Sequence, residues 1–137
     1  MAFDRYPEAI AAFLQAGHFA VVGASTNREK YGNKVLRCYL QHDLPVVAVN
    51  PRAETIEGAP CVPSLREVPV ETKAASVVAP PAFAAQIVED ALARGVEHLW
   101  FQPGAEEPAA VAAARERGLS VIADGSCLLV ALGFRDE

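Results

Sequence analysis

Five short, continuously apolar runs alternate along this 137-residue sequence with segments whose apolar residues recur at helical spacing. A strand that is apolar throughout is typical of a parallel sheet with helices on both faces. The alternation of strand and helix also favours parallel pairing through right-handed crossovers. The expected strands are Phe19–Val22, Pro45–Val49, Ala74–Ala79, His98–Phe101 and Leu119–Ala123, and the expected helices are Pro7–Ala16, Asn33–Gln41, Ala82–Arg94 and Glu106–Arg117.

This pattern predicts an α/β fold with a doubly wound, Rossmann-like sheet of five parallel strands in the order 3-2-1-4-5. In that order the fourth strand lies beside the first. Residues 1–137 are expected to form one domain. Arg52–Pro69 is expected to be mostly loop, with Ser64–Glu67 suited to one helical turn, and Ser126–Phe134 suits a strand or a helix. Since ligands bind at the carboxyl ends of such strands, the loops that follow the strands are the expected site.

The composition argues against several classes of partner. A net charge of −5 disfavours nonspecific binding of nucleic acid, which depends on a basic surface. Cys38, Cys61 and Cys127 are odd in number and lack ligand spacing, so neither a disulfide framework nor a metal site is expected. No apolar run reaches the roughly 20 residues of a membrane span, and the N-terminus lacks a signal-peptide core. We therefore expect a cytoplasmic protein without a membrane partner.

The loop Gly23–Asn33, after the first expected strand, has features of a phosphate site. Its two glycines allow a tight turn and a close backbone approach to a ligand. Free amides at a helix start attract a phosphate, and Arg28 and Lys30 add positive charge. The loop is not a dinucleotide fingerprint, because Ser25 occupies the place of the second glycine. The alternative is a strand-to-helix turn without a ligand, which rarely needs so long a polar, cationic loop.

The second expected strand ends in Asn50-Pro51-Arg52. NAD-binding domains place an acidic residue there to hold the ribose hydroxyls. A carboxylate would repel a phosphate on the ribose, whereas the Arg52 guanidinium would attract one. Coenzyme A carries such a phosphate at the 3′ position and NADP at the 2′ position. The loop therefore disfavours NAD and allows either phosphorylated ligand, unless Arg52 is an ordinary surface arginine.

Two later loops are candidates for the rest of a nucleotide ligand. Ala79-Pro80-Pro81 ends the third expected strand, and its prolines suit a helix start and offer a flat apolar surface for an adenine. Gln102-Pro103-Gly104 follows the fourth strand, and a pantetheine arm fits between it and the Gly23 loop. Each loop is also explained by architecture alone. Phe83 and Trp100 are expected in the core.

Candidates for catalysis are sparse. His18 and His98 begin expected strands, at the edge opposite the site, and His42 lies in a turn. None of them accompanies a nucleophile motif. Cys127 follows the fifth strand on the functional side, where a reactive thiol and a buried structural thiol are both consistent with the sequence. We therefore predict no catalytic residue and no enzymatic activity.

The order and spacing of Val21–Ser25, Asn50-Pro51-Arg52, Gly58 and Val77–Phe83 resemble those of the CoA-binding domain family. These are small stand-alone proteins similar to the N-terminal domain of the succinyl-CoA synthetase alpha subunit and of ADP-forming acyl-CoA synthetases. The resemblance extends over about Phe19–Leu128. It implies a Rossmann-like nucleotide-binding fold with coenzyme A as the ligand.

The resemblance also implies which residues contact the ligand. In this family the glycine-serine loop meets the CoA phosphates, the Asn-Pro turn meets the adenosine end, and a proline-rich turn follows the third strand. The corresponding residues here are Gly23, Ala24, Ser25, Lys30, Tyr31, Gly32, Asn50, Pro51, Arg52, Ala79, Pro80 and Pro81, with a looser match at Gln102 and Gly104.

Three functions are consistent with the sequence. The first is a non-catalytic binding or regulatory protein that holds CoA or an acyl-CoA. The synthetases phosphorylate a histidine in a second domain and need a partner subunit, so a chain of 137 residues is expected to bind without that reaction. The alternatives are an NADP-binding oxidoreductase or its remnant, and a protein-interaction module with a vestigial nucleotide site. A protein partner or a homo-oligomer is compatible with each.

Overall fold

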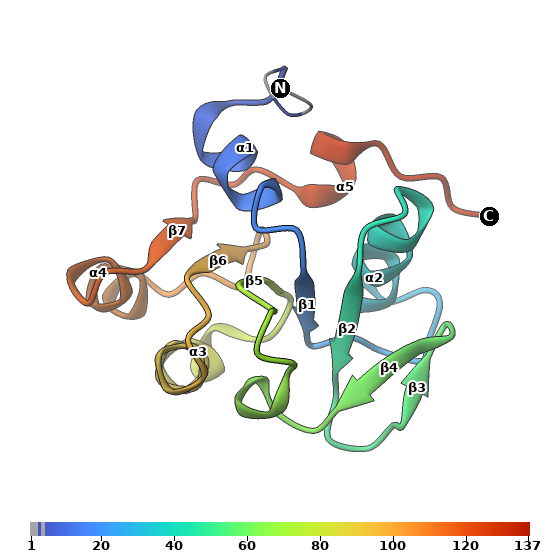
Figure 1. Cartoon of the computed structure of the whole chain (residues 1–137), viewed down its shortest axis with the longest axis horizontal. Helices are drawn as coiled ribbons and strands as arrows, with labels where there is room; N and C mark the ends of the chain where they lie inside the picture. Colours follow the sequence, from blue (N-terminus) through green and yellow to red (C-terminus); the bar gives the residue numbers. More distant parts are fainter. Residues whose placement is uncertain (1–2, 4) are drawn as a thin grey trace.

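Within the described residues, 3 and 5–137 of the computed structural model, a seven-stranded sheet forms the centre of the protein (Figure 1). The strand order is β3-β4-β2-β1-β5-β6-β7, and every neighbouring pair is parallel except β3 and β4. The strands are β1 (Phe19–Val22), β2 (Val46–Val49), β3 (Thr55–Ile56), β4 (Ala59–Val62), β5 (Ala74–Val77), β6 (His98–Phe101) and β7 (Ser120–Ile122).

Helices cover both faces of the sheet, as continuously apolar strands require. Phe19 and Val21 of β1 pack with the helices of one face, whereas Ala20 and Val22 pack with those of the other. The expected α/β, Rossmann-like fold is thereby confirmed. One face carries α1 (Glu8–Leu14), α2 (Tyr31–Gln41) and α5 (Leu128–Leu132); the other carries α3 (Ala84–Arg94) and α4 (Pro108–Glu116), and two short 3-10 helices, η1 (Leu65–Glu67) and η2 (Pro81–Phe83), precede α3.

Aromatic side chains fill the layer between the sheet and α1 and α2. The rings of Phe13 and Trp100 meet edge to face with centroids 5.3 Å apart, and Phe19 stacks on Tyr39 at 5.0 Å. The Tyr39 hydroxyl lies 2.6 Å from Ser76 Oγ on β5, so its buried polar atom has a partner. All of these aromatic residues are almost fully buried, which confirms the expectation for Trp100.

The strand order differs from the expected five-stranded order 3-2-1-4-5. Residues 52–69, expected as a loop, contain a β-hairpin whose second strand, β4, pairs with β2. This strand takes the place beside β2 that was expected for Ala74–Ala79, and β5 pairs with β1 instead. β6 pairs with β5, so the prediction that the fourth strand neighbours the first was wrong. Pro60 favoured a loop, yet it lies one residue before the ladder with β2, where a missing N–H costs little.

The segment 126–134, for which the sequence left strand and helix open, contains the short helix α5. The residues after it lie against α2, where an imidazole nitrogen of His42 is 2.8 Å from the Gly133 carbonyl oxygen. Arg37 of α2 is buried, and it pairs with Asp136 at 3.0 Å. The end of the chain is therefore held on the outer side of α2.

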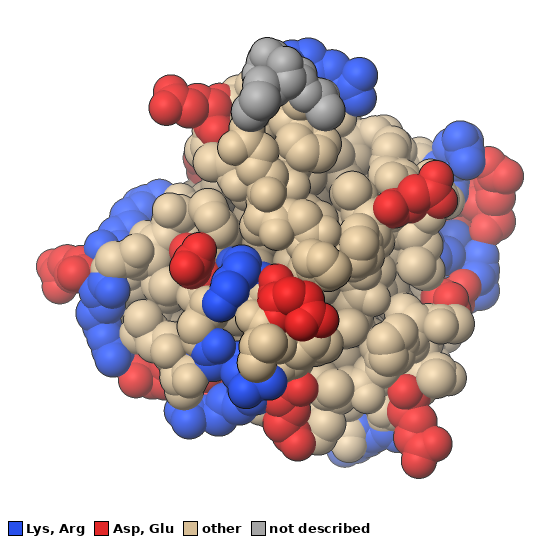
Figure 2. Space-filling model, in the orientation of Figure 1, with Lys and Arg blue, Asp and Glu red and all other residues tan. Residues whose placement is uncertain are grey.

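Charged side chains of both signs are interspersed on the face that Figure 2 shows. None of the described helices has the length and apolar character needed to cross a membrane.

Glu57, in the turn between β3 and β4, fixes the hairpin to the start of α2. Its carboxylate accepts a hydrogen bond from Asn33 Nδ2 at 3.2 Å and forms an ion pair with Arg28. These contacts, the Asn33 hydrogen bond above all, lower the pKa of Glu57 below its ordinary value near 4.5. The hairpin that the sequence did not predict is thus tied to the loop expected to hold a phosphate.

We expect Glu57→Gln to lower the free energy of unfolding at neutral pH by about 1 kcal/mol. The substitution removes the negative charge that pairs with Arg28 and accepts a hydrogen bond from Asn33. The folded-state pKa of Glu57 lies below the unfolded one, so its contribution is complete above about pH 5 and is lost as the pH falls through the folded value. Urea unfolding between pH 7 and pH 3 measures both effects. Glu54→Gln, an exposed neighbour without a side-chain hydrogen bond in the described structure, serves as the control. An acid sensitivity in Glu57→Gln equal to that of the wild type would contradict this role.

Candidate functional site

Three adjoining cavities follow the carboxyl ends of the parallel strands and together form one groove. The central cavity, of about 490 Å³, lies between the β1–α2 loop and the turn after β5. A second, of about 340 Å³, extends toward the end of β2, and a third, of about 220 Å³, extends toward the end of β6. Ala79 lines all three. The groove therefore crosses the point between β1 and β5 where the strand order reverses, which is where ligands bind in such sheets.

The start of α2 faces the central cavity. Lys30 directly precedes the helix and makes no side-chain capping bond. It is exposed and has no ion-pair partner among the described residues. The first N–H groups of a helix lack partners within it and carry the positive end of its dipole, so this wall attracts an anion. The cavity is lined by all six residues expected from this loop: Gly23, Ala24, Ser25, Lys30, Tyr31 and Gly32.

Two glycines bring backbone segments into contact beside this cavity. A β-carbon on Gly23 would lie 2.0 Å from the carbonyl oxygen of Val78, and one on Gly32 would lie 2.0 Å from the carbonyl oxygen of Gly23. Gly23 also has a φ of +89°, which favours glycine. The glycines were expected to let the backbone approach a ligand closely. In the structure they let the loop pack closely against the end of β5 and against the first turn of α2.

Side-chain amides hold the β1–α2 loop from both sides. Asn50, after β2, donates from Nδ2 to the Ala24 carbonyl at 2.8 Å and accepts from the Arg52 N–H at 2.8 Å. Asn33 of α2 donates to the Ser25 carbonyl at 2.8 Å. Asn50 lines the groove as expected, but its polar atoms bond to the protein, so it acts as a brace for the loop.

The cavity at the end of β2 is largely apolar and includes an aromatic ring. Pro51 and Pro63 line it, and Phe83 lines both this cavity and the central one. Phe83 is 57% exposed, so the expectation that it belongs to the core was wrong. The turn η2 ends at Phe83 and α3 begins at Ala84, which is buried, so the inner stripe of the helix starts one residue later than expected.

The cavity at the end of β6 is lined by Gln102 and Gly104, with Ala79 and Pro80 across from them. The Gln102 loop therefore faces the turn after β5, whereas it was expected to face the Gly23 loop. Gln102 still reaches the start of α2, because the Tyr31 hydroxyl donates to Gln102 Oε1 at 3.0 Å. The groove runs over the end of β5.

Arg52, Pro81 and Arg28 were expected near the ligand, but they do not line the groove. Arg52 and Pro81 follow the lining residues Pro51 and Pro80 but do not line the cavities. Arg28 is paired with Glu57, and its Nη2 donates to the Glu137 carbonyl at 2.6 Å. Lys30 is therefore the lysine or arginine that lines the central cavity.

The sequence did not point to several residues that complete the cavity at the end of β2. Ser64 comes from the connection between β4 and η1, and Gln86 and Asp90 come from α3. Gln86 Nε2 donates to Asp90 Oδ1 at 2.9 Å. The spacing of these two residues on one polar helix face was the one available signal, and polar faces of this kind are common on solvated helices.

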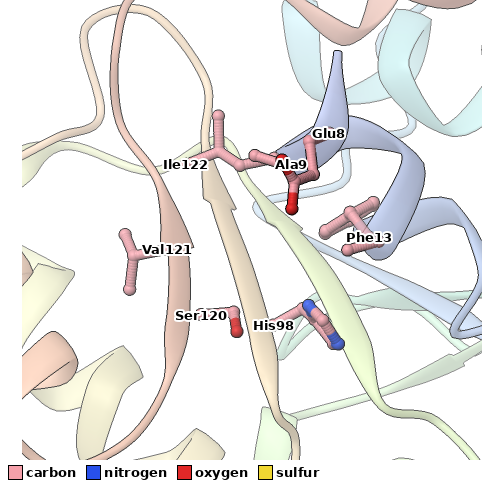
Figure 3. Close-up of a pocket in the computed structure, with 8 residues that line it drawn as sticks. Glu8, Ala9, Phe13, His98, Ser120, Val121 and Ile122 are labelled. Atoms are coloured by element: carbon pink, nitrogen blue, oxygen red, sulfur yellow. The ribbon is translucent and has the colours of Figure 1, made fainter. Parts of the chain in front are cut away.

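A further cavity, of about 360 Å³, lies at the opposite end of the sheet (Figure 3). Glu8 and Phe13 of α1 line one side, and His98 and Ser120 line the other. Burial lowers the pKa of His98. This position agrees with the prediction that His98 lies away from the groove. Among the described residues, no group of three or more His, Cys, Asp or Glu side chains is arranged to hold a metal ion.

Comparison with known proteins gives one family. A family model described as a CoA binding domain matches residues 17–132. An ADP-forming acetate–CoA ligase from Archaeoglobus fulgidus is 32% identical over 106 residues, which are 77% of this chain and 16% of the ligase.

Solved structures with the same fold include short proteins and a segment of a long one. A conserved hypothetical protein from Pyrococcus furiosus is 37% identical with a TM-score of 0.78, over 82% of this chain and 97% of that chain. A hypothetical protein from Pyrococcus horikoshii is 28% identical with a TM-score of 0.84, over 90% and 87%. A dinucleotide-forming acetyl-coenzyme A synthetase from Ca. Korarchaeum cryptofilum is 27% identical with a TM-score of 0.71, over 80% of this chain and 26% of that chain.

We expect Gly32→Ala to destabilise the protein by about 3 kcal/mol, because its β-carbon would meet a backbone carbonyl held between two packed elements. Gly118→Ala is the control. Gly118 has a φ of +94° and open space around it, so only the backbone conformation is strained, at roughly 1 kcal/mol. Thermal or urea unfolding compares the two variants. A loss for Gly32→Ala no larger than that for Gly118→Ala would show that the glycine contact is not a constraint.

Proposed function

The chain belongs to the CoA-binding domain family, and we propose that it binds coenzyme A, or an acyl-CoA, in the groove along the carboxyl ends of β2, β1, β5 and β6. The curated ligase is far longer than this chain, which spans 16% of it. The ligase reaction is therefore no part of the proposal. The proposed role is binding without catalysis.

The central cavity carries this proposal. It combines the amides at the start of α2 with the ammonium group of Lys30, which has no ion-pair partner among the described residues, and both favour the pyrophosphate of CoA. The loop that forms this wall is braced by Asn33 and Asn50 through main-chain carbonyls. A braced loop keeps its amides oriented before the ligand arrives, so less conformational entropy is lost on binding.

The cavity at the end of β2 suits the adenosine. Its apolar wall includes Pro51, Pro63 and the exposed ring of Phe83, and flat apolar surfaces of this kind accept an adenine. Arg52 follows Pro51 and is exposed, so its long side chain is free to meet the ribose 3′-phosphate. Asn50 has no place among the ligand donors in this account, because its amide bonds to the loop.

The cavity at the end of β6 suits the pantetheine arm. Ala79 and Pro80 supply apolar contact, and Gln102 supplies an amide group at the far wall. The arm carries two amide groups, which need hydrogen-bond partners when they leave water. CoA carries its adenosine on one side of the pyrophosphate and its pantetheine arm on the other. The groove matches this order, because its apolar cavity and its amide-lined cavity lie on either side of the cationic central cavity.

The proposed absence of catalysis rests on the groups that line the groove. Burial and the contact with Cys127 raise the pKa of Tyr31, so its phenol keeps its proton at neutral pH and is a poor general base. His98 lines a cavity, but that cavity lies at the opposite end of the sheet. General acid–base chemistry needs a group that titrates near the working pH within reach of the ligand.

We expect Lys30→Ala to weaken binding of both CoA and 3′-dephospho-CoA by about 10- to 100-fold, the loss typical of one charge-assisted hydrogen bond. Arg52→Ala should weaken CoA alone and make the two affinities equal, because only CoA carries the 3′-phosphate. Arg117→Ala, which removes a cation paired with Glu89 on α3, is the matched control. Isothermal titration calorimetry measures all three variants.

Failure of the folded wild-type protein to bind either ligand would overturn the proposed function and favour a protein-interaction role. Tighter binding of NADP than of CoA would favour a dinucleotide ligand. Equal affinity of the wild type for CoA and 3′-dephospho-CoA would remove the role of Arg52 and leave the rest of the proposal intact.

A further inference from the structure

Three segments that are distant in the sequence bring a thiol, a phenol and an amide together at the end of the groove. Tyr31 begins α2, Gln102 follows β6, and Cys127 directly precedes α5. The Tyr31 hydroxyl lies 2.6 Å from Cys127 Sγ and 3.0 Å from Gln102 Oε1. Tyr31 lines the central cavity and Gln102 lines the cavity at the end of β6, so the thiol lies one hydrogen bond behind the groove wall.

The hydrogen bonds of this cluster determine which group donates and which accepts. Gln102 Oε1 accepts from the Leu128 N–H at 2.8 Å and from the Tyr31 hydroxyl. The phenol has one proton, which it donates to Gln102 Oε1. The Cys127 thiol therefore donates to the Tyr31 oxygen. Either atom of this contact can be the donor, so the phenol can also turn and donate its proton to the Cys127 sulfur.

The same glutamine carries an unpartnered donor. Gln102 is fully buried, and its Nε2 has no hydrogen-bond partner among the described residues. Burying a donor without an acceptor is unfavourable, so this N–H group is suited to an acceptor supplied by a bound molecule. The amide carbonyls of pantetheine are acceptors of this kind, and the nitrogen of the last amide group is joined to the CoA thiol by a short ethylene segment.

We propose that Cys127 is the site at which this protein forms a mixed disulfide with coenzyme A held in the groove. The inference rests on the proposed function, because the nucleotide must be bound for its thiol end to reach Gln102 and Cys127. It adds a covalent step to a binding site: the protein traps oxidised CoA and releases it on reduction.

The step is an exchange with CoA disulfide, the oxidised form in which two CoA molecules share one S–S bond. The Cys127 thiol gives its proton to solvent, and the thiolate attacks one sulfur of the bound disulfide. A bond forms between Cys127 Sγ and that sulfur, the original S–S bond breaks, and the second CoA leaves as a thiolate that takes a proton from water. The protein thiol is oxidised, and the departing CoA thiol is the reduced product.

The other two cysteines are less suited to this reaction. Cys38 is fully buried, and burial raises its pKa to about 12. Cys61 is half-buried, burial raises its pKa, and its thiol lies 3.5 Å from the Asn50 carbonyl oxygen. Cys61 is nonetheless accessible enough to serve as the comparison thiol within the same chain.

The test incubates the reduced wild-type protein, freed of reductant, with CoA disulfide. Intact-mass spectrometry counts the adducts, and peptide mapping identifies the modified cysteine. We expect one CoA per chain, on Cys127, removed by dithiothreitol. The rate should exceed that with glutathione disulfide at equal micromolar concentration by at least about tenfold, since a groove-bound disulfide has an effective concentration near the millimolar range. Cys61→Ser should give the same adduct, and Cys127→Ser should give none.

Calorimetry of CoA binding in the presence of reductant separates the two proposals. Reversible CoA binding with no adduct, or with the adduct on Cys61, overturns the mixed disulfide and leaves the proposed function standing. An adduct on Cys127 that forms equally fast with glutathione disulfide also overturns it, because the groove then does not direct the reaction. Absence of CoA binding overturns the proposed function and this inference together. Peptide mapping of the wild type decides the site even if Cys127→Ser does not fold.

Discussion

Two backbone contacts at glycine hold together the point where the strand order reverses. The carbonyl of Val78 approaches Gly23, and the carbonyl of Gly23 approaches Gly32, each so closely that a β-carbon would lie 2.0 Å from the oxygen. The first contact seats the β1–α2 loop on the end of β5, and the second seats α2 on the loop. These two contacts determine the direction in which α2 starts, the position of Lys30 and the reach of Tyr31 toward Gln102. The side-chain amides of Asn33 and Asn50 bond to carbonyls of the loop, so contacts within the protein itself hold the loop in place.

The hairpin β3–β4 determines where the groove lies. Because β4 occupies the place beside β2, the chain returns to the centre of the sheet and β5 pairs with β1. The turn after β5 then becomes the floor of the groove, with Ala79 lining all three cavities and Pro80 lining the central one and the one at the end of β6. This arrangement separates three kinds of surface along one groove: cationic at the start of α2, apolar and aromatic at the end of β2, and amide with a nearby thiol at the end of β6.

The sequence was sufficient for the fold class and for most of the groove wall, because both depend on local signals. Continuous apolar runs indicate buried strands, and polar residues after them mark the carboxyl edge. The sequence was not sufficient where pairing between distant segments determines the order of the strands. Nothing local shows that β4 displaces β5 from β2, and Pro60 argued against a strand there. Phe83 was assigned to the wrong face because a 3-10 turn, invisible to helical periodicity, precedes α3. The contact of Tyr31 with Cys127 joins residues 96 positions apart, so no spacing rule reveals it.

We propose that one ligand, coenzyme A, occupies the three cavities in a defined direction. The decisive measurement is a crystal structure of the protein with CoA. We expect the pyrophosphate against Lys30 and the first amides of α2, the adenine beside Pro51 and Phe83, and the thiol end at Gln102. CoA bound in the reverse direction, or in the cavity between α1 and the starts of β6 and β7, would contradict it.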